Sequence, residues 1–271
     1  TQLCFCPATA KGVQGCAADS TAWGACKCEG TADDATNNQA DSSVFEPPDA
    51  GSADSDTGTD QPDSDTPLVD DCPDRAKQVY VVASDTTLLR FFPDTLKLVT
   101  VGKLKCPQAG GGEPFAMSID RNADAWVLYT KGLFAGGGLF KVSTKDASCQ
   151  ATAYKTGQAG FELFGMGFSA DSPGSKAETL FIAGGSALTW QFSAGKLGTI
   201  GMPGLGVTHK ATINVGNGAP ELTGDGTGGL WGFFPQTNPP SVRAIDKKTG
   251  KTGQSWSIPV GIMSNVHAWT F

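Results

Sequence analysis

Asp120-Arg-Asn-Ala-Asp-Ala-Trp126 recurs as Asp225-Gly-Thr-Gly-Gly-Leu-Trp231, and this repeat decides the fold. In both copies an aspartate and a tryptophan stand six positions apart across a turn of small residues. The carboxylate of such an aspartate can accept hydrogen bonds from neighbouring backbone N–H groups, and the aromatic ring can bury a large apolar face. We therefore interpret Asp120, Trp126, Asp225 and Trp231 as structural residues of the repeat.

The repeat has a period of about 50 residues, which is the size of a propeller blade. Trp126, Phe181 and Trp231 are spaced 55 and 50 residues apart, and Phe181 belongs to a degenerate copy. Each copy contains short runs of β-branched and aromatic residues between Gly, Pro and Asp turns, as four short strands would. The units are predicted at 79–106, 114–155, 164–201 and 220–258.

We predict an all-β fold, a β-propeller of four-stranded blades at 72–271 that is incomplete or truncated. Strand-like residues at 266–271 end the sequence. Either this strand joins the incomplete first blade and closes the ring, or the native chain is longer and the ring larger. We favour the second interpretation, because a strand that stops on an aromatic residue without a polar tail is a poor natural terminus.

Two segments precede the predicted propeller. Residues 1–30 hold five of the eight cysteines and are predicted to be a small head that disulfides staple, since so short a segment cannot build an apolar core. Residues 31–71 hold eleven Asp and one Glu without Lys or Arg, which predicts a disordered acidic tether.

Charge is distributed unevenly along the chain. The net charge is −7, with a balance of −12 in residues 1–71 and +5 in residues 72–271. Lysines and arginines are not clustered as nucleic-acid binding requires, so we expect no nucleic-acid partner. We interpret Lys247, Lys248 and Lys251 as a solvated hairpin tip. No run of about 18 apolar residues is present, so no transmembrane helix is expected. A lipid anchor upstream of Thr1 remains open.

The cysteines favour export to an oxidising compartment. Eight cysteines in a loop-rich chain are typical of disulfides, whereas the C-x-C pairs of the head lack the spacing and the histidine of a usual zinc site. Cys106 and Cys149 follow the third strand of consecutive blades, so we predict that they form a disulfide between blades, with two buried thiols as the alternative. We expect an extracellular, periplasmic or outer-surface location.

Three short motifs resemble those of known proteins. The Asp-turn-Trp phrase resembles blades of bacterial extracellular and sensor propellers, and residues 245–251 resemble a turn of quinoprotein-like propeller repeats. In the head, Gly12-x-Gln14-x-Cys16 followed by a Trp and two cysteines resembles small Cys-rich modules of bacterial cell-envelope proteins and thrombospondin-type repeats. These resemblances imply a propeller of a bacterial secreted or cell-envelope protein. They say little about function.

The sequence offers no catalytic constellation. His209 and His267 are the two histidines, no nucleophile elbow is present, and the Gly-rich runs lack the residues of a phosphate loop. Asp120, Asp171 and Asp225 occupy matching repeat positions and are candidates to meet at a central channel, although periodicity alone explains them. We expect no cofactor and no metal.

The leading functional hypothesis is an exported, non-catalytic propeller that binds a protein, peptide or glycan. Loops carry function on such scaffolds, and the longest are predicted at 107–115, 132–138, 171–178 and 202–219. They contain Glu113, His209 and Lys210, which are the candidate ligand-binding residues. The alternative is a propeller enzyme, a lactonase, lyase or quinoprotein-like dehydrogenase, with its site at the central channel. A purely structural envelope module is a third possibility.

Overall fold

The computed structural model describes two units of the chain, Thr1–Pro62 and Asp63–Phe271, each considered by itself. The described residues are 2–5, 11–14, 27–28, 72–106, 112–131, 136–186, 195–213, 215 and 218–259. In the first unit, β1 (Gln2–Phe5), β2 (Lys11–Gln14) and β3 (Lys27–Cys28) form an antiparallel sheet in that order. The side chains of the head and the strand predicted at 266–271 lie outside the described residues.

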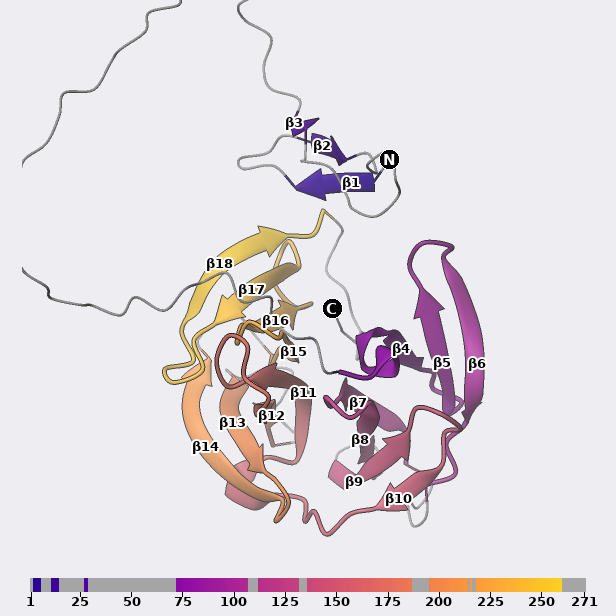
Figure 1. The fold of residues 1–271 in the computed structure, drawn as a ribbon. Helices are drawn as coiled ribbons and strands as arrows, with labels where there is room; N and C mark the ends of the chain where they lie inside the picture. The colour runs from indigo at the N-terminus through magenta and orange to yellow at the C-terminus, as the bar shows by residue number, and fades with distance from the viewer. Residues whose placement is uncertain are drawn as a thin grey trace, which may run out of the picture. The chain divides into compact units, whose positions relative to one another are not determined.

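Four antiparallel sheets follow one another along the second unit, and they confirm the predicted all-β propeller (Figure 1). Blade 1 has β4 (Val79–Val82), β5 (Thr87–Phe92) and β6 (Lys97–Lys103). Blade 2 has β7 (Pro114–Ile119), β8 (Asp124–Thr130), β9 (Gly136–Ser143) and β10 (Cys149–Ala151). Blade 3 has β11 (Leu163–Ala170), β12 (Glu178–Gly185), β13 (Gly195–Gly201) and β14 (Gly206–Ile213). Blade 4 has β15 (Glu221–Gly224), β16 (Leu230–Phe234), β17 (Ser241–Ile245) and β18 (Thr252–Ser257). Two short 3-10 helices, η1 (Asp74–Lys77) and η2 (Gln158–Gly160), are the helices of the described residues.

The third blade differs from its prediction at its outer edge. In the predicted unit 164–201 the last two strands fall at 187–192 and 196–200, and a loop is expected at 202–219. In the structure β13 is the third strand and β14 is the fourth. A tight turn joins the two strands, in which Leu205 adopts a left-handed conformation with φ of 57° and its N–H donates to the Gly201 carbonyl. The glycines around this turn suggested a long loop. The strand predicted at 187–192 lies outside the described residues.

Glycine lets the first strands of blades 3 and 4 approach closely. A Cβ atom at Gly165 of β11 would lie 2.6 Å from the Cα atom of Glu221 in β15. One at Gly167 would lie 2.7 Å from the Cα atom of Thr223. Real Cβ atoms do not sit so close to backbone, so a side chain at either glycine would push the two strands apart.

Three buried apolar clusters fill the spaces between consecutive blades. Tyr80 and Leu88 of blade 1 pack with Val127 of blade 2. Further along, Leu128 of blade 2 packs with Phe164 of blade 3. The third cluster joins blades 3 and 4 and includes Phe181, Ala183, Leu197, Ile213, Leu222, Leu230, Phe234 and Ile245. Strand β8 is buried on both faces for this reason, since blade 2 lies between blades 1 and 3. Among the described residues no such cluster joins blade 4 to blade 1.

An aspartate and a tryptophan bridge the first turn of blades 2 and 4. In blade 2, the Trp126 Nε1–H donates to Asp120 Oδ2 at 3.0 Å, while Asp120 Oδ1 accepts the N–H groups of Asn122 and Asp124, both at 2.9 Å. The same three bonds form in blade 4, where the Trp231 Nε1–H donates to Asp225 Oδ2 at 2.9 Å. Each carboxylate thus satisfies two backbone donors of the turn and one indole.

Replacement of Asp120 by alanine is expected to lower the free energy of unfolding by about 2–3 kcal/mol, because two backbone N–H groups and a buried indole lose their acceptor. Asp171→Ala is the matched control. Asp171 occupies the same repeat position but is exposed and accepts the Thr179 hydroxyl, so its loss should cost well under 1 kcal/mol. Urea unfolding followed by tryptophan fluorescence measures both values. Equal losses for the two variants would contradict the structural role of the bridge.

A disulfide connects the first two blades, as predicted. Cys106 follows β6, Cys149 begins β10, and the two are bonded. The bond closes a loop over a sequence separation of 43 residues. It also lies where the β9–β10 turn meets blade 1, since a Cβ atom at Gly102 would lie 3.0 Å from the Ala147 Cβ atom. The bond therefore fixes the outer edge of this seam.

Replacement of both Cys106 and Cys149 by serine should destabilise the propeller by up to about 4 kcal/mol, the chain-entropy value for a loop of this length. The measurement is the urea midpoint of the double variant against the oxidised wild type. The wild type with a reducing agent should approach the variant. A midpoint that is the same in all three samples would show that the bond does not restrain the chain.

Candidate functional site

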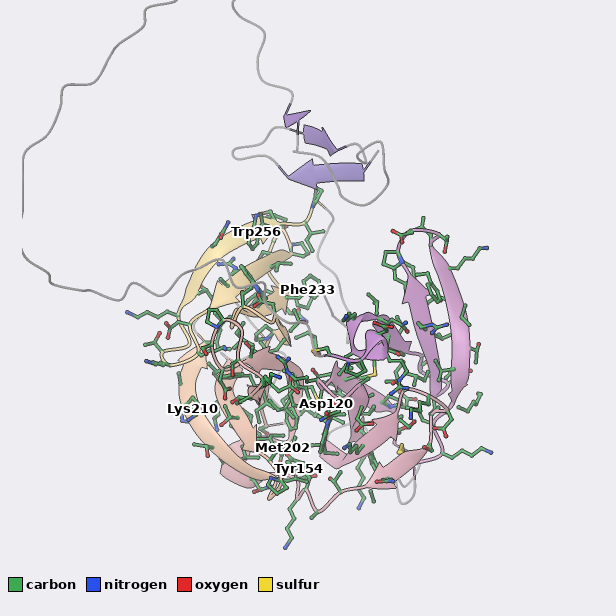
Figure 2. All side chains as sticks on the ribbon, in the orientation of Figure 1. Asp120, Tyr154, Met202, Lys210, Phe233 and Trp256 are labelled. Carbon is green, nitrogen blue, oxygen red and sulfur yellow. A yellow bond between two sulfur atoms is a disulfide. The ribbon has the colours of Figure 1, made fainter. Side chains whose placement is uncertain are left out.

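A groove of about 630 Å³ runs between blades 3 and 4, and its volume is typical of a ligand site. It is lined by Glu178, Thr179, Leu180, Phe181, Thr199, Ile200, Gly201, Met202, Lys210, Lys247 and Lys248. Strands β12, β13 and β14 supply the blade 3 side, and the β17–β18 turn supplies the two neighbouring lysines of blade 4. Figure 2 shows Met202 and Lys210 on blade 3.

The β17–β18 turn holds its lysines in a fixed backbone. Asp246 Oδ1 accepts the N–H groups of Lys248 at 3.0 Å and Thr249 at 2.7 Å, and it also accepts the Thr249 hydroxyl. The side-chain hydrogen bond from Thr249, followed by the backbone bonds, lowers the pKa of the Asp246 carboxyl. Gly250 closes the turn with φ of 68°, and a Cβ atom there would lie 2.8 Å from the Thr212 carbonyl oxygen. Only glycine fits this contact with β14 without a shift.

Lys247 reaches from blade 4 across the seam to blade 3. Its ammonium donates to the carbonyl oxygen of Ala170 at 2.6 Å and lies 5.4 Å from the centre of the Phe181 ring. Partial burial lowers the pKa of Lys247, while the carboxylates of Asp171 and Asp225 act in the opposite direction. The lysine therefore contributes a partly buried, positively charged group to the groove lining.

Lys210 and Lys248 present their ammonium groups to solvent. Both residues are exposed, and no hydrogen bond or ion pair joins either side chain to the described residues. Glu178 is the acidic residue of the lining. It accepts the Arg121 N–H at 2.7 Å, and burial raises the pKa of its carboxyl although this bond opposes the shift. The groove thus carries more positive than negative groups.

The three predicted ligand-binding residues do not form one site. Lys210 lines the groove, whereas Glu113 is exposed at the start of β7 in blade 2, where its N–H donates to the Thr130 hydroxyl. His209 lies in β14 and not in a Gly-rich loop as the sequence suggested; its ring is 6.5 Å from that of Phe161. His209 is absent from the groove lining.

Sequence reasoning missed one buried acid, Glu221 at the start of β15. Its side chain is 6% exposed, and its Oε2 atom would lie 2.6 Å from a Cβ atom at Gly165. No hydrogen bond joins its carboxyl to the described residues. Burial raises the pKa of Glu221 to about 8. A single acid at the start of a strand gives no periodic signal, so only the approach of β11 to β15 reveals it.

Glu221 should make stability fall as pH rises. The folded pKa of about 8 lies above the ordinary value of 4.5, so the unfolded chain ionises this group first. Its contribution is intact below about pH 4.5 and is lost progressively as pH rises through 8. Glu221→Gln should therefore be more stable than the wild type at pH 9, with a difference that shrinks by pH 5. Urea unfolding at pH 5, 7 and 9 measures this; a constant difference across the three values would contradict the raised pKa.

Comparisons with known proteins are consistent with the propeller fold and assign the chain to no family. No family model matches the chain, and no curated protein matches it. The chain is similar to the calcium-binding protein regucalcin from Agrobacterium tumefaciens, at 13% identity and a TM-score of 0.42 over 72% of this chain and 60% of that one. It is also similar to the Dos1 propeller, at 12% identity and a TM-score of 0.38 over 71% and 47%. A structure of the nidogen–laminin complex is similar at 14% identity and a TM-score of 0.37, over 69% of this chain and 78% of that one.

The strand order within the sheets and the packing of each sheet on the next define the class as a β-propeller, with four blades among the described residues and a groove at the third seam. The chain spans 60% of the length of the regucalcin structure and 47% of that of the Dos1 structure, in both cases less than two thirds. Within the described residues no helix is long and apolar enough to cross a membrane. The same residues contain no group of three or more His, Cys, Asp or Glu side chains placed to hold a metal ion.

Proposed function

We propose that this chain is an exported, non-catalytic propeller that binds a protein, peptide or glycan at the cell surface through the groove between blades 3 and 4. The observation that carries the proposal is the groove itself, in which two exposed lysines stand beside apolar lining. Exposed polar groups beside apolar lining are the ordinary composition of a binding site. Lys210, one of the sequence-predicted residues, belongs to it.

Export is part of the proposal, and the cysteines support it. A disulfide forms between Cys106 and Cys149, and structural disulfides persist in oxidising compartments. A mass measurement of the oxidised and reduced protein, purified from an exporting host, would count the remaining bonds.

A propeller enzyme is the second candidate, and Glu221 is the observation that favours it. A carboxyl that stays protonated at neutral pH can donate a proton to a leaving group. General acid catalysis needs a further group that acts on the same substrate. Among the described residues no partner is in contact with the Glu221 carboxyl, so the binding function is preferred.

Gly201→Trp should block the groove and abolish ligand binding without unfolding the blade. Gly201 is exposed in the lining, and a Cβ atom there meets nothing closer than the Gly206 carbonyl oxygen at 3.7 Å. Gly204→Trp is the matched control, because Gly204 belongs to the same turn, has open space at its Cβ position and is absent from the lining. Ligands are first found with the wild-type chain on peptide, protein and glycan arrays and then measured by calorimetry.

We expect the Gly201 variant to lose at least tenfold in affinity, and the Gly204 variant to retain wild-type affinity. If the Gly201 and Gly204 variants bind the ligand with equal affinity, the binding site lies outside the groove. An array without any specific ligand would remove the binding function. Turnover of an array compound that Glu221→Gln abolishes would establish the enzyme instead.

A further inference from the structure

We propose that the groove between blades 3 and 4 recognises an acidic, extended peptide segment of its partner, in which carboxylates flank an apolar side chain. This inference rests on the proposed binding function and adds the chemical class of the ligand. Lys210, Lys247 and Lys248 would meet the carboxylates, and the apolar lining would take the side chain between them.

The repeat itself shows that two of these lysines are not required by the fold. The turn before the last strand has the same hydrogen bonds in three blades. In blade 4 the Gly250 N–H donates to the Asp246 carbonyl, in blade 2 the Ala147 N–H donates to that of Ser143, and in blade 3 the Leu205 N–H donates to that of Gly201. The three donor residues have positive φ values of 68°, 60° and 57°, in the same order.

These equivalent turns place different residues beside the neighbouring seam. Lys247 and Lys248 stand three and two positions before the donor residue of the blade 4 turn. The same two positions are occupied in blade 2 by Thr144 and Lys145, and in blade 3 by Met202 and Pro203. The turn therefore folds in blade 2 without a lysine at the Lys247 position, and in blade 3 without a lysine at either position.

Lys210 has an uncharged equivalent as well. It is the extra residue of a bulge in β14, between Ala211, which pairs with Leu197, and His209. In blade 1 the extra residue of the bulge in β6 is Val101, between Thr100 and Gly102, and it is the uncharged equivalent of Lys210. The packing agrees: a Cβ atom at Gly250 would lie 3.1 Å from the Ala211 Cβ atom, and one at Gly102 would lie 3.0 Å from the Cβ atom of Ala147 in the blade 2 turn.

Blades 3 and 4 thus gather three ammonium groups where the first seam has one. Like charges in one groove repel each other, and Glu178 already accepts the Arg121 N–H. The exposed Asp246 carboxylate of the β17–β18 turn attracts Lys248, and Lys210 has no hydrogen bond or ion pair within the described residues. An anionic ligand would relieve this repulsion, and the attraction would be strong because one lysine is partly desolvated.

The lining favours a peptide over an anionic polysaccharide. Sugars stack on open aromatic rings, but the Phe181 ring is only 6% exposed and lies beneath the Lys247 ammonium. The Thr179 hydroxyl already donates to Asp171 at 2.7 Å. Met202 is 41% exposed, and methionine adapts its shape to apolar side chains of protein partners.

The test is fluorescence anisotropy with the full chain and a fluorescein-labelled ten-residue peptide of alternating glutamates around a central leucine. The same peptide with glutamines is the control ligand, and sodium alginate, a polyuronate, is the competitor. The double variant Lys210→Glu/Lys248→Glu reverses the two exposed charges. Lys251→Glu is the control variant, since Lys251 is exposed in the same turn but absent from the lining.

We expect the acidic peptide to bind the wild type and the Lys251 variant alike, and the double variant at least tenfold more weakly. The glutamine peptide should not bind, and affinity for the acidic peptide should fall between 50 and 200 mM NaCl.

Three results would overturn the inference. Equal binding of the glutamine peptide would remove the role of charge. An equal loss in the Lys251 variant would show unspecific attraction, and stronger binding of alginate would assign the groove to a polysaccharide. Loss of binding in Gly201→Trp without any loss in the double variant would contradict the acidic ligand and leave the proposed binding function standing.

Discussion

The hydrogen bond from a tryptophan indole to an aspartate carboxylate organises the blades that carry it. The aspartate follows the first strand, and the tryptophan lies in the second, so the bond sets the register of both. It also aims a large ring at a neighbour. The Trp126 ring lies 6.4 Å from that of Phe168 in the next blade, within the range of aromatic pairs. One local interaction therefore links the fold of a blade to the packing between blades.

Blade 3 departs from this arrangement, and the groove lies where it does. Trp126 pairs with Ser118, two residues before Asp120, and in blade 3 the matching position is Thr179, which pairs with Ser169. The Thr179 hydroxyl donates to the exposed Asp171 where the other two blades have an indole, and the Phe181 phenyl ring follows two residues later. The Lys247 ammonium from blade 4 packs over that phenyl ring and takes the carbonyl of Ala170. The apolar cluster between the two blades keeps this seam closed below the groove.

Local sequence was sufficient for the elements that repeat. The spacing of Asp120 and Trp126 predicted both the turn and its role, and the positions of Cys106 and Cys149 predicted their bond. What depended on contacts between distant segments was missed. Lys247 and Lys248 looked like a solvated hairpin tip, because only the packing of that turn on β14 brings them beside Lys210. The strand nature of β14 was hidden by the glycines that bound it.

Glu221 and the groove belong to the same seam, and this connects stability to binding. Gly165 lets β11 approach β15 so closely that the Glu221 carboxyl is buried, with no hydrogen bond to the described residues. Ionisation of that group would cost free energy, which opening of the seam would relieve. The lysines of the groove come from the two blades that such an opening would separate. A ligand that contacts both blades would therefore resist the opening, and protonation of Glu221 would favour the closed seam to which that ligand binds.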